Sequence, residues 1–148
     1  MYEFLGYQVR DVMSSPVTIA PEASLAEAEQ LLEARGFNAL PVVSGEGELV
    51  GILSSLDILK AFRFTEHSLF PPYEEIMRRQ VGSVMSGSPV TVRPRTPLTR
   101  VLEKMLATRD KSFPVVDGSR LVGVVAREDV MRALRRADAG EEAGREGP

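Results

Sequence analysis

The chain has 148 residues, a formal net charge of −3 at pH 7, no cysteine and one histidine, which predicts one domain or two small units that share a core. The missing cysteines exclude a disulfide scaffold, a thiolate nucleophile and a cysteine-ligated zinc, and a single histidine leaves little for base catalysis, so we expect neither a metal site nor an enzyme. The apolar runs are far shorter than the roughly 18 to 20 residues that span a bilayer, and residues 1–8 do not resemble a signal peptide, so we expect a cytoplasmic protein with no membrane association.

The first half of the chain predicts a strand, a helix, two strands and a second helix. Short β-branched or apolar stretches indicate the strands, and an apolar stripe with helical spacing indicates the first helix. Ser24 with Glu27 three residues later forms a capping-box pattern, and Gly36 is suited to the other end of that helix. In chain order, the expected elements are a strand at 17–19, a helix at 24–36, strands at 40–43 and 49–53, and a helix from about Leu56.

The same sequence then occurs a second time. The offset is 72 residues, or 73 after an inserted glycine, and the three matching blocks keep their order. Two copies are too few for a solenoid, so we expect a pseudo-symmetric pair. The matching blocks are 9–21 with 81–94, 40–45 with 113–118, and 49–57 with 121–129.

Two segments lie outside this repeat. Residues 63–80 connect the copies and contain several aromatic side chains, which favours packing on the body of the protein over a mobile lid or a partner-docking loop. Residues 137–148 hold no apolar side chain beyond alanine, which predicts disorder. The expected organisation is a first repeat at 9–62, a connector at 63–80, a second repeat at 81–136 and a disordered tail.

Charge is divided unevenly along the chain. Residues 1–76 hold four bases and twelve acids, whereas residues 77–136 hold thirteen bases and five acids. Such a division is typical of an anionic ligand near the basic part or of head-to-tail pairing of two copies. Two solvated faces that differ in charge would give the same pattern.

The repeated blocks resemble those of a tandem CBS-domain pair, also called a Bateman module. The blocks read Val-Met-Ser…Pro-Val-Thr, Pro-Val-Val-x-Gly and Leu-Val-Gly-x-x-x-x-x-Asp, and the resemblance covers nearly the whole chain. It implies an α/β (α+β) fold of two β-α-β-β-α units packed sheet to sheet. It also implies a sensor of adenine nucleotides or their derivatives that commonly forms a dimer.

The resemblance places a ligand site on the first copy. Gly51, Ser54 and Asp57 match the family's Gly-x-x-(Ser/Thr)-x-x-Asp signature, in which the carboxylate accepts hydrogen bonds from the ribose hydroxyls and the serine makes a second contact. The same Ser-x-x-Asp spacing is also a helix-capping signature, and both roles can coexist. By the same resemblance, backbone groups before a proline read the adenine edge and apolar side chains line the slot: Asn38, Ala39, Leu40 and Pro41 for the edge, and Val17, Ile19 and Ile52 for the slot.

The second copy departs from this signature. Asp129 is present, but Ala126 replaces the serine, and Lys111 stands in place of Asn38. The resemblance implies that Lys111, with help from Arg127, binds the phosphate of a ligand on Asp57. Solvated surface charge is the alternative for both residues. We therefore expect one competent site for a phosphorylated ligand on Asp57, and a second site on Asp129 that is weak, empty or used for an uncharged adenosine-like ligand.

The sequence thus predicts a regulatory module that binds an adenine nucleotide (AMP, ADP, ATP or an adenosyl derivative) in the cleft between the repeats. It would use no cofactor, form a homodimer and signal to a separate client protein. One alternative is a ligand-free interaction or oligomerisation module. Another is nucleic-acid binding through the basic second copy, which the total charge and the lack of interleaved aromatic residues disfavour.

Overall fold

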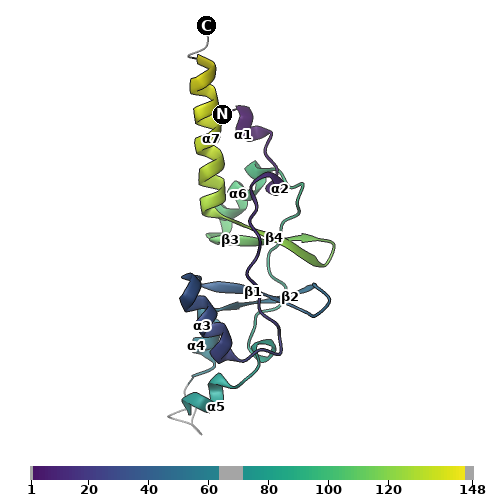
Figure 1. Cartoon of the computed structure of the whole chain (residues 1–148), viewed down its shortest axis with the longest axis vertical. Helices are drawn as coiled ribbons and strands as arrows, with labels where there is room; N and C mark the ends of the chain where they lie inside the picture. Colours follow the sequence, from purple (N-terminus) through teal and green to yellow (C-terminus); the bar gives the residue numbers. More distant parts are fainter. Residues whose placement is uncertain (1, 64–71, 146–148) are drawn as a thin grey trace. The chain divides into compact units, whose positions relative to one another are not determined.

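The structure, a computed structural model, describes residues 2–63 and 72–145, with side chains described up to residue 140. The chain forms two compact units, each with its own core (Figure 1). Unit 1 comprises Met1–Pro16 and Val90–Pro148, and unit 2 comprises Val17–Pro89. Each unit therefore takes the strands and helices of one repeat together with the leading block of the other.

Unit 2 is built around the antiparallel pair β1 (Ala39–Val43) and β2 (Leu49–Ser54). Helix α3 (Leu25–Arg35) precedes this pair and α4 (Ser55–Lys60) follows it directly. The leading block of the second repeat adds the short helix η1 (Val81–Ser83). Helix α5 (Tyr73–Met77) buries Ile76 and Met77 in the same core, so the described part of the connector packs on unit 2. Residues 64–71 of the connector lie outside the described residues.

Unit 1 repeats this plan with β3 (Ser112–Asp117) and β4 (Arg120–Ala126), which are also antiparallel. Helix α6 (Leu98–Thr108) precedes the pair and α7 (Arg127–Arg145) follows it. The N-terminal residues add α1 (Tyr2–Leu5) and α2 (Val9–Val12). The expected α+β class is confirmed. None of the helices in the described residues is long and apolar enough to cross a membrane.

The first strand expected in each copy is reduced to one bridging residue. Ile19 pairs in parallel with Val42: its N–H donates to the Pro41 carbonyl (3.1 Å) and its carbonyl accepts from Val43 (2.9 Å). The next parallel bonds on either side would need N–H groups at Pro41 and Pro21, which proline lacks. Unit 1 has the same single bridge, at Val92. The sequence pattern therefore located the pairing but overestimated its length.

The tail expected to be disordered is helical as far as Arg145, because α7 continues beyond the repeat. Ala137 is fully buried in the unit 1 core together with Phe4 of α1, and α1 packs against α7. Alanine, glutamate and arginine, which dominate the segment, are also good helix formers. Residues 146–148 lie outside the described residues.

Candidate functional site

Asp57 lies in the first turn of α4, directly after β2. The Ser54 hydroxyl accepts a hydrogen bond from the Asp57 N–H (3.1 Å), and Asp57 Oδ2 accepts one from the Ser54 N–H (2.9 Å). This reciprocal capping box satisfies two backbone donors that the helix itself leaves free. The predicted capping role of Ser54 and Asp57 is therefore confirmed. Capping uses Oδ2 and leaves Oδ1 of Asp57, a residue that is only 7% exposed, for another hydrogen-bond donor.

The second oxygen of Asp57 meets the leading block of the second repeat. Ser86 Oγ donates a hydrogen bond to Asp57 Oδ1 (3.2 Å). The Ser86 backbone is fixed beside β2, because its N–H and carbonyl both bond to Ile52, each at 2.9 Å. Within the described part of the chain, no lysine or arginine pairs with Asp57. The free oxygen thus contacts a neutral hydroxyl alone.

The predicted slot residues divide between the two faces of the β1–β2 pair. Pro41 and Ile52 are cross-strand partners and are half-buried, as is Val17. Leu40 and Ile19 belong to the opposite face and lie in the unit 2 core, at 0% and 8% exposure. Ile19 follows Val42 into the core because paired residues on neighbouring strands share a face. Its side chain therefore does not line a slot on the Pro41 face.

The backbone expected to read an adenine edge lies at the start of β1. Asn38 and Ala39 are exposed. The Asn38 carbonyl accepts a hydrogen bond from the Ser55 N–H (2.9 Å), and Ala39 is the cross-strand partner of Ser54. These residues therefore lie next to the capping box of α4. Unit 2 alone brings together Asp57, Ser54, Ile52, Pro41 and the Asn38–Ala39 backbone.

Unit 1 holds the equivalent carboxylate in different surroundings. Asp129 Oδ2 accepts a hydrogen bond from the Ala126 N–H (2.7 Å), which is half of the capping box, since Ala126 has no hydroxyl to return it. Asp129 Oδ1 accepts from Ser14 Oγ (3.4 Å) and from Arg132 Nη1 (3.2 Å). Asp129 is 4% exposed. It is therefore an ion-paired carboxylate, whereas Asp57 is not.

The two basic residues expected to bind phosphate both belong to unit 1. Arg127 donates side-chain hydrogen bonds to the carbonyls of Arg109 and Asp110, so its guanidinium fastens the turn that precedes β3. Lys111 is exposed, and its carbonyl accepts from the Arg127 N–H (3.0 Å). Arg127 thus stabilises the turn before β3 within unit 1.

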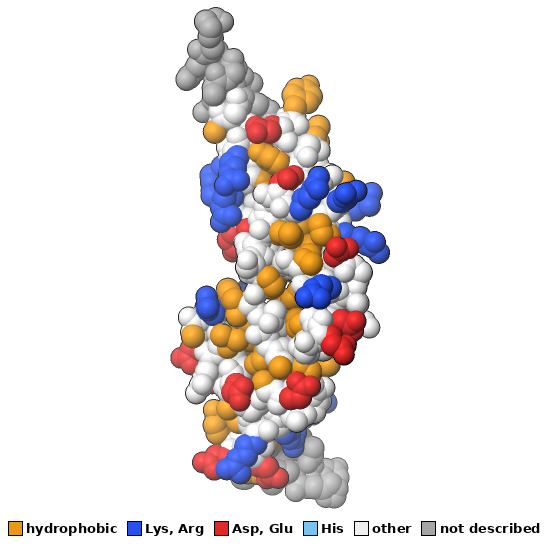
Figure 2. Space-filling view, turned by 45° about the vertical axis from the view of Figure 1, so that its right-hand side comes forward, with side chains coloured by type: hydrophobic (Ala, Val, Ile, Leu, Met, Phe, Trp, Pro, Cys, Tyr) orange, Lys and Arg blue, Asp and Glu red, His pale blue; other side chains and the backbone are white. Residues whose placement is uncertain are grey.

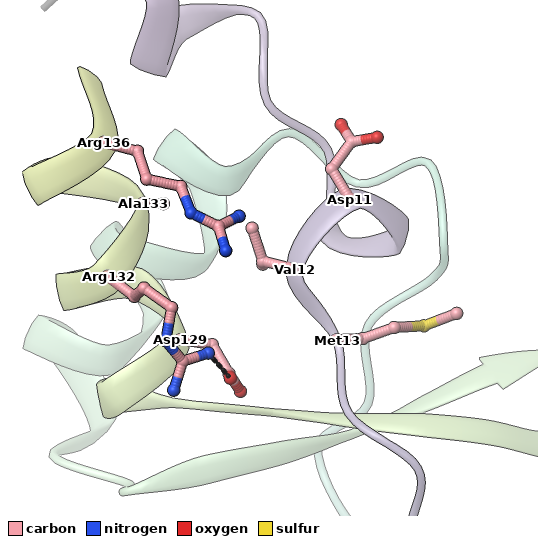
Figure 3. A pocket seen from close by; sticks show the side chains of 7 residues that line it. All are labelled: Asp11, Val12, Met13, Asp129, Arg132, Ala133 and Arg136. Atoms are coloured by element: carbon pink, nitrogen blue, oxygen red, sulfur yellow. Dashed lines mark hydrogen bonds and ion pairs between the residues drawn. The ribbon is translucent and has the colours of Figure 1, made fainter. Parts of the chain in front are cut away.

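A cavity of about 110 Å³ opens beside Asp129, between α7 and the C-terminal end of α2 (Figure 3). In Figure 3 the Arg132 guanidinium lies over Asp129, and the Arg136 guanidinium faces the same space. The residues that line it are Asp11, Val12, Met13, Asp129, Arg132, Ala133 and Arg136.

Sequence reasoning missed Ser14, Ser86 and Arg132 as contacts of the two aspartates. Both serines follow the repeated Val-Met pair, so the repeat itself carried the signal. The repeat did not show, however, that the leading block of each repeat packs beside the aspartate of the other repeat. Arg132 has no such signal, because position 60, its counterpart, holds an exposed lysine.

The two units also differ in overall charge. Unit 2 holds five bases and ten acids, whereas unit 1 holds thirteen bases and eleven acids. Figure 2 shows lysine and arginine side chains gathered on the part of the molecule that carries α7. In the described residues, no group of three histidine, aspartate or glutamate side chains is placed to hold a metal ion. Unit 2 therefore carries a net negative charge, which disfavours binding of a phosphate by that unit.

A model of the CBS domain matches residues 9–63 and 81–136. Among curated proteins, the L-aspartate semialdehyde sulfurtransferase of Methanocaldococcus jannaschii is 36% identical over 126 residues, which is 84% of this chain but only 22% of that enzyme. The chain thus spans a small part of such relatives, so their activities do not transfer to it.

Two solved structures cover almost the same length as this chain. CBSX2 of Arabidopsis thaliana, crystallised with AMP, has a TM-score of 0.75 and 30% identity, covering 90% of this chain and 99% of that one. The CBS domain pair of protein MJ0100, crystallised with 5-methylthioadenosine and S-adenosyl-L-methionine, has a TM-score of 0.67 and 30% identity, covering 88% and 98%. Both ligand sets contain adenosine.

Proposed function

We propose that this chain, which belongs to the CBS-domain family, binds an adenosine-containing ligand on unit 2 through Asp57, and that ligand occupancy regulates a separate client protein. The observation that carries the proposal is the buried Asp57 carboxylate, which keeps one oxygen for a neutral hydroxyl after capping α4. The proposal is supported by similar CBS pairs crystallised with AMP, 5-methylthioadenosine and S-adenosyl-L-methionine.

The chemistry of Asp57 suits a ribose diol. Its carboxylate accepts hydrogen bonds without donating any, and a diol can donate two. The ribose would replace the Ser86 hydroxyl at Oδ1, so one neutral hydroxyl exchanges for another while the capping bond from the Ser54 N–H stays in place. Such bonds to an ionised acceptor are stronger than those between neutral groups. A diol can donate two such bonds where the Ser86 hydroxyl donates one, so the exchange favours the ligand.

The adenine would lie against the Pro41 face of the β1–β2 pair. Pro41 and Ile52 are half-buried, so they present apolar surface that a base can cover. Val17, also half-buried, packs against the unit 2 core instead. The Asn38–Ala39 backbone, at the end of β1 next to Ser54, is placed to read the edge of the base. Leu40 contributes through its backbone only, since its side chain is fully buried.

A thermal-shift panel tests the proposal. We expect AMP, ADP, ATP, 5-methylthioadenosine or S-adenosylmethionine to raise Tm by about 5 to 10 °C at 100 times the dissociation constant, because such saturation adds about 2.7 kcal/mol to the free energy of unfolding. GTP, which has the ribose but a different base, should raise Tm less. If no adenosine compound raises Tm, the chain is an interaction module that works without ligand.

Regulation requires that the ligand bind one arrangement of the protein better than another. We propose that the protein acts as a homodimer in which helix surfaces of two copies meet. Leu59 on α4 and Met131 on α7 occupy equivalent positions in the two repeats and are 67% and 57% exposed. Exposed apolar side chains at matched helix positions are suited to a symmetric interface.

Light scattering tests the dimer. We expect the Leu59→Lys/Met131→Lys double variant to weaken association by about 30-fold or more, the effect of removing hot-spot side chains worth about 2 kcal/mol or more. Leu106→Lys on α6 is the matched control, since Leu106 is 73% exposed. A wild-type chain that runs as a monomer, or a control as disruptive as the double variant, would contradict this interface.

A further inference from the structure

The two units differ in what faces the free oxygen of the buried aspartate. In unit 2 this oxygen of Asp57 contacts the Ser86 hydroxyl. In unit 1 the corresponding oxygen of Asp129 contacts both the Ser14 hydroxyl and the Arg132 guanidinium. The repeat gives position 60 a lysine where position 132 has an arginine, and Lys60 is exposed and forms no ion pair with Asp57 in the described structure.

We infer that Arg132 closes the Asp129 position to ribose-containing ligands and so limits the chain to one ligand, an inference that rests on the function proposed above. A ribose hydroxyl that binds Asp129 must displace the Arg132 guanidinium, which exchanges an ion-paired hydrogen bond for one from a neutral donor. The same hydroxyl arriving at Asp57 displaces only a neutral serine. Arg132 is thus the residue that determines which aspartate is available.

The surroundings of Arg132 keep it on Asp129. Arg136 lies one turn further along α7 and lines the same cavity, so its like charge disfavours movement of Arg132 toward that side (Figure 3). Asp11 lines the cavity too, but its Oδ2 accepts a hydrogen bond from the Gln8 N–H (2.8 Å). In Figure 3 its carboxylate points away from Arg132. Asp129 is therefore the acceptor that the Arg132 side chain, 48% exposed, reaches.

Ala126 is a second difference between the surroundings of Asp129 and those of Asp57. In unit 2 the Ser54 hydroxyl completes the capping box and lies next to Asp57 as a second polar group. Ala126 has no hydroxyl. It therefore neither completes a capping box on α7 nor offers a second polar contact to a ligand at Asp129. Removal of the Arg132 side chain should accordingly let a ribose bind Asp129, and Ala126→Ser should raise the affinity further.

The experiment measures AMP binding by calorimetry in an Asp57→Asn background, where binding on unit 2 is weakened. We expect the Asp57→Asn chain to bind AMP weakly, and the added Arg132→Leu substitution to restore affinity by about 5- to 30-fold, the factor that one to two kcal/mol provides. Leucine is chosen because it retains apolar volume beside Ala133 without a charge. A further Asp129→Asn substitution should abolish the restored binding, which assigns it to that carboxylate.

The controls separate this inference from the function on which it rests. Arg135→Leu in the same background removes an exposed charge of α7 that does not line the cavity, and it should restore nothing. Wild-type protein that fails to bind AMP, or Asp57→Asn protein that binds it normally, would overturn the proposed site. Normal wild-type binding, loss in Asp57→Asn and no recovery with Arg132→Leu would overturn the role of Arg132 alone.

Discussion

Replacing Asp57 with asparagine should weaken binding of an adenosine ligand by about 30- to 150-fold. Asparagine has one acceptor oxygen, which the Ser54 N–H uses in capping α4, and no charge. An NH2 group then faces the ribose; it accepts neither hydroxyl hydrogen and can only donate a weaker hydrogen bond to a ribose oxygen. Hydrogen bonds to charged groups contribute about 1.5 to 3 kcal/mol each, and a total loss of about 2 to 3 kcal/mol gives this factor. Calorimetric titration with the adenosine compound that raises Tm most is the measurement.

Asp57→Asn is preferable to alanine because it retains the cap of α4, and two further variants serve as its controls. The amide oxygen can still accept the hydrogen bond from the Ser54 N–H, so the cap of α4 is retained and the fold is preserved. Asp129→Asn makes the same chemical change at the equivalent position and should leave affinity unchanged, because ion-paired Asp129 is not the proposed site. Ser86→Ala retains the carboxylate and removes the hydroxyl that the ligand displaces, so affinity should hold or improve. Loss of binding in both control variants would show a general effect of altering these contacts.

The sequence predicted the element order and the capping box because both depend on local patterns. Ser54 and Asp57 are three residues apart on one chain segment, and their reciprocal bonds follow from helix geometry alone. The apolar stripe of α3 likewise becomes the core of unit 2, with Leu25, Ala28 and Leu32 buried. Such features involve neighbours in sequence, so one sequence suffices to predict them.

The contacts of the aspartates could not be predicted, because they join residues far apart in sequence. Ser86 lies 29 positions from Asp57, and Ser14 lies 115 positions from Asp129. The repeat shows that the two pairs are equivalent, but it does not show that each leading block packs beside the strands of the other copy. The pairing of Arg132 with Asp129 was equally invisible, since its spacing is common on exposed helices.

Spacing left both capping and ribose binding open for Asp57; the structure shows the capping role, and ribose binding stays a proposal with which the geometry is compatible. Capping uses Oδ2, which bonds to the Ser54 N–H, and leaves Oδ1 to the Ser86 hydroxyl. Asp129 shows the same division, with Oδ2 on the Ala126 N–H and Oδ1 on outside partners. A capping carboxylate therefore holds itself in a fixed orientation while its second oxygen remains available. This is the arrangement that a preformed ligand contact requires.

The close approach of Ser86 to β2 depends on Gly51, and Gly51→Ala should lower Tm by about 5 to 10 °C. A Cβ at position 51 would lie 2.7 Å from the Ser86 carbonyl oxygen and 2.7 Å from Met85 Sδ. The thioether can move, but the carbonyl is fixed by its bond to the Ile52 N–H. Overpacking of this kind typically costs about 1 to 3 kcal/mol, and the fixed position of the Ser86 carbonyl places this site at the upper end.

The same substitution should also weaken ligand binding, because β2 leads directly into Ser54 and Asp57. Gly45→Ala is the matched control: a Cβ there meets nothing within 4 Å, so Tm should stay within about 1 to 2 °C. Differential scanning calorimetry of both variants, with and without the adenosine compound, gives the two effects separately. A Gly51→Ala protein as stable as the Gly45→Ala control would mean that the leading block of the second repeat is not held against β2, and the orientation of Asp57 would then need another explanation.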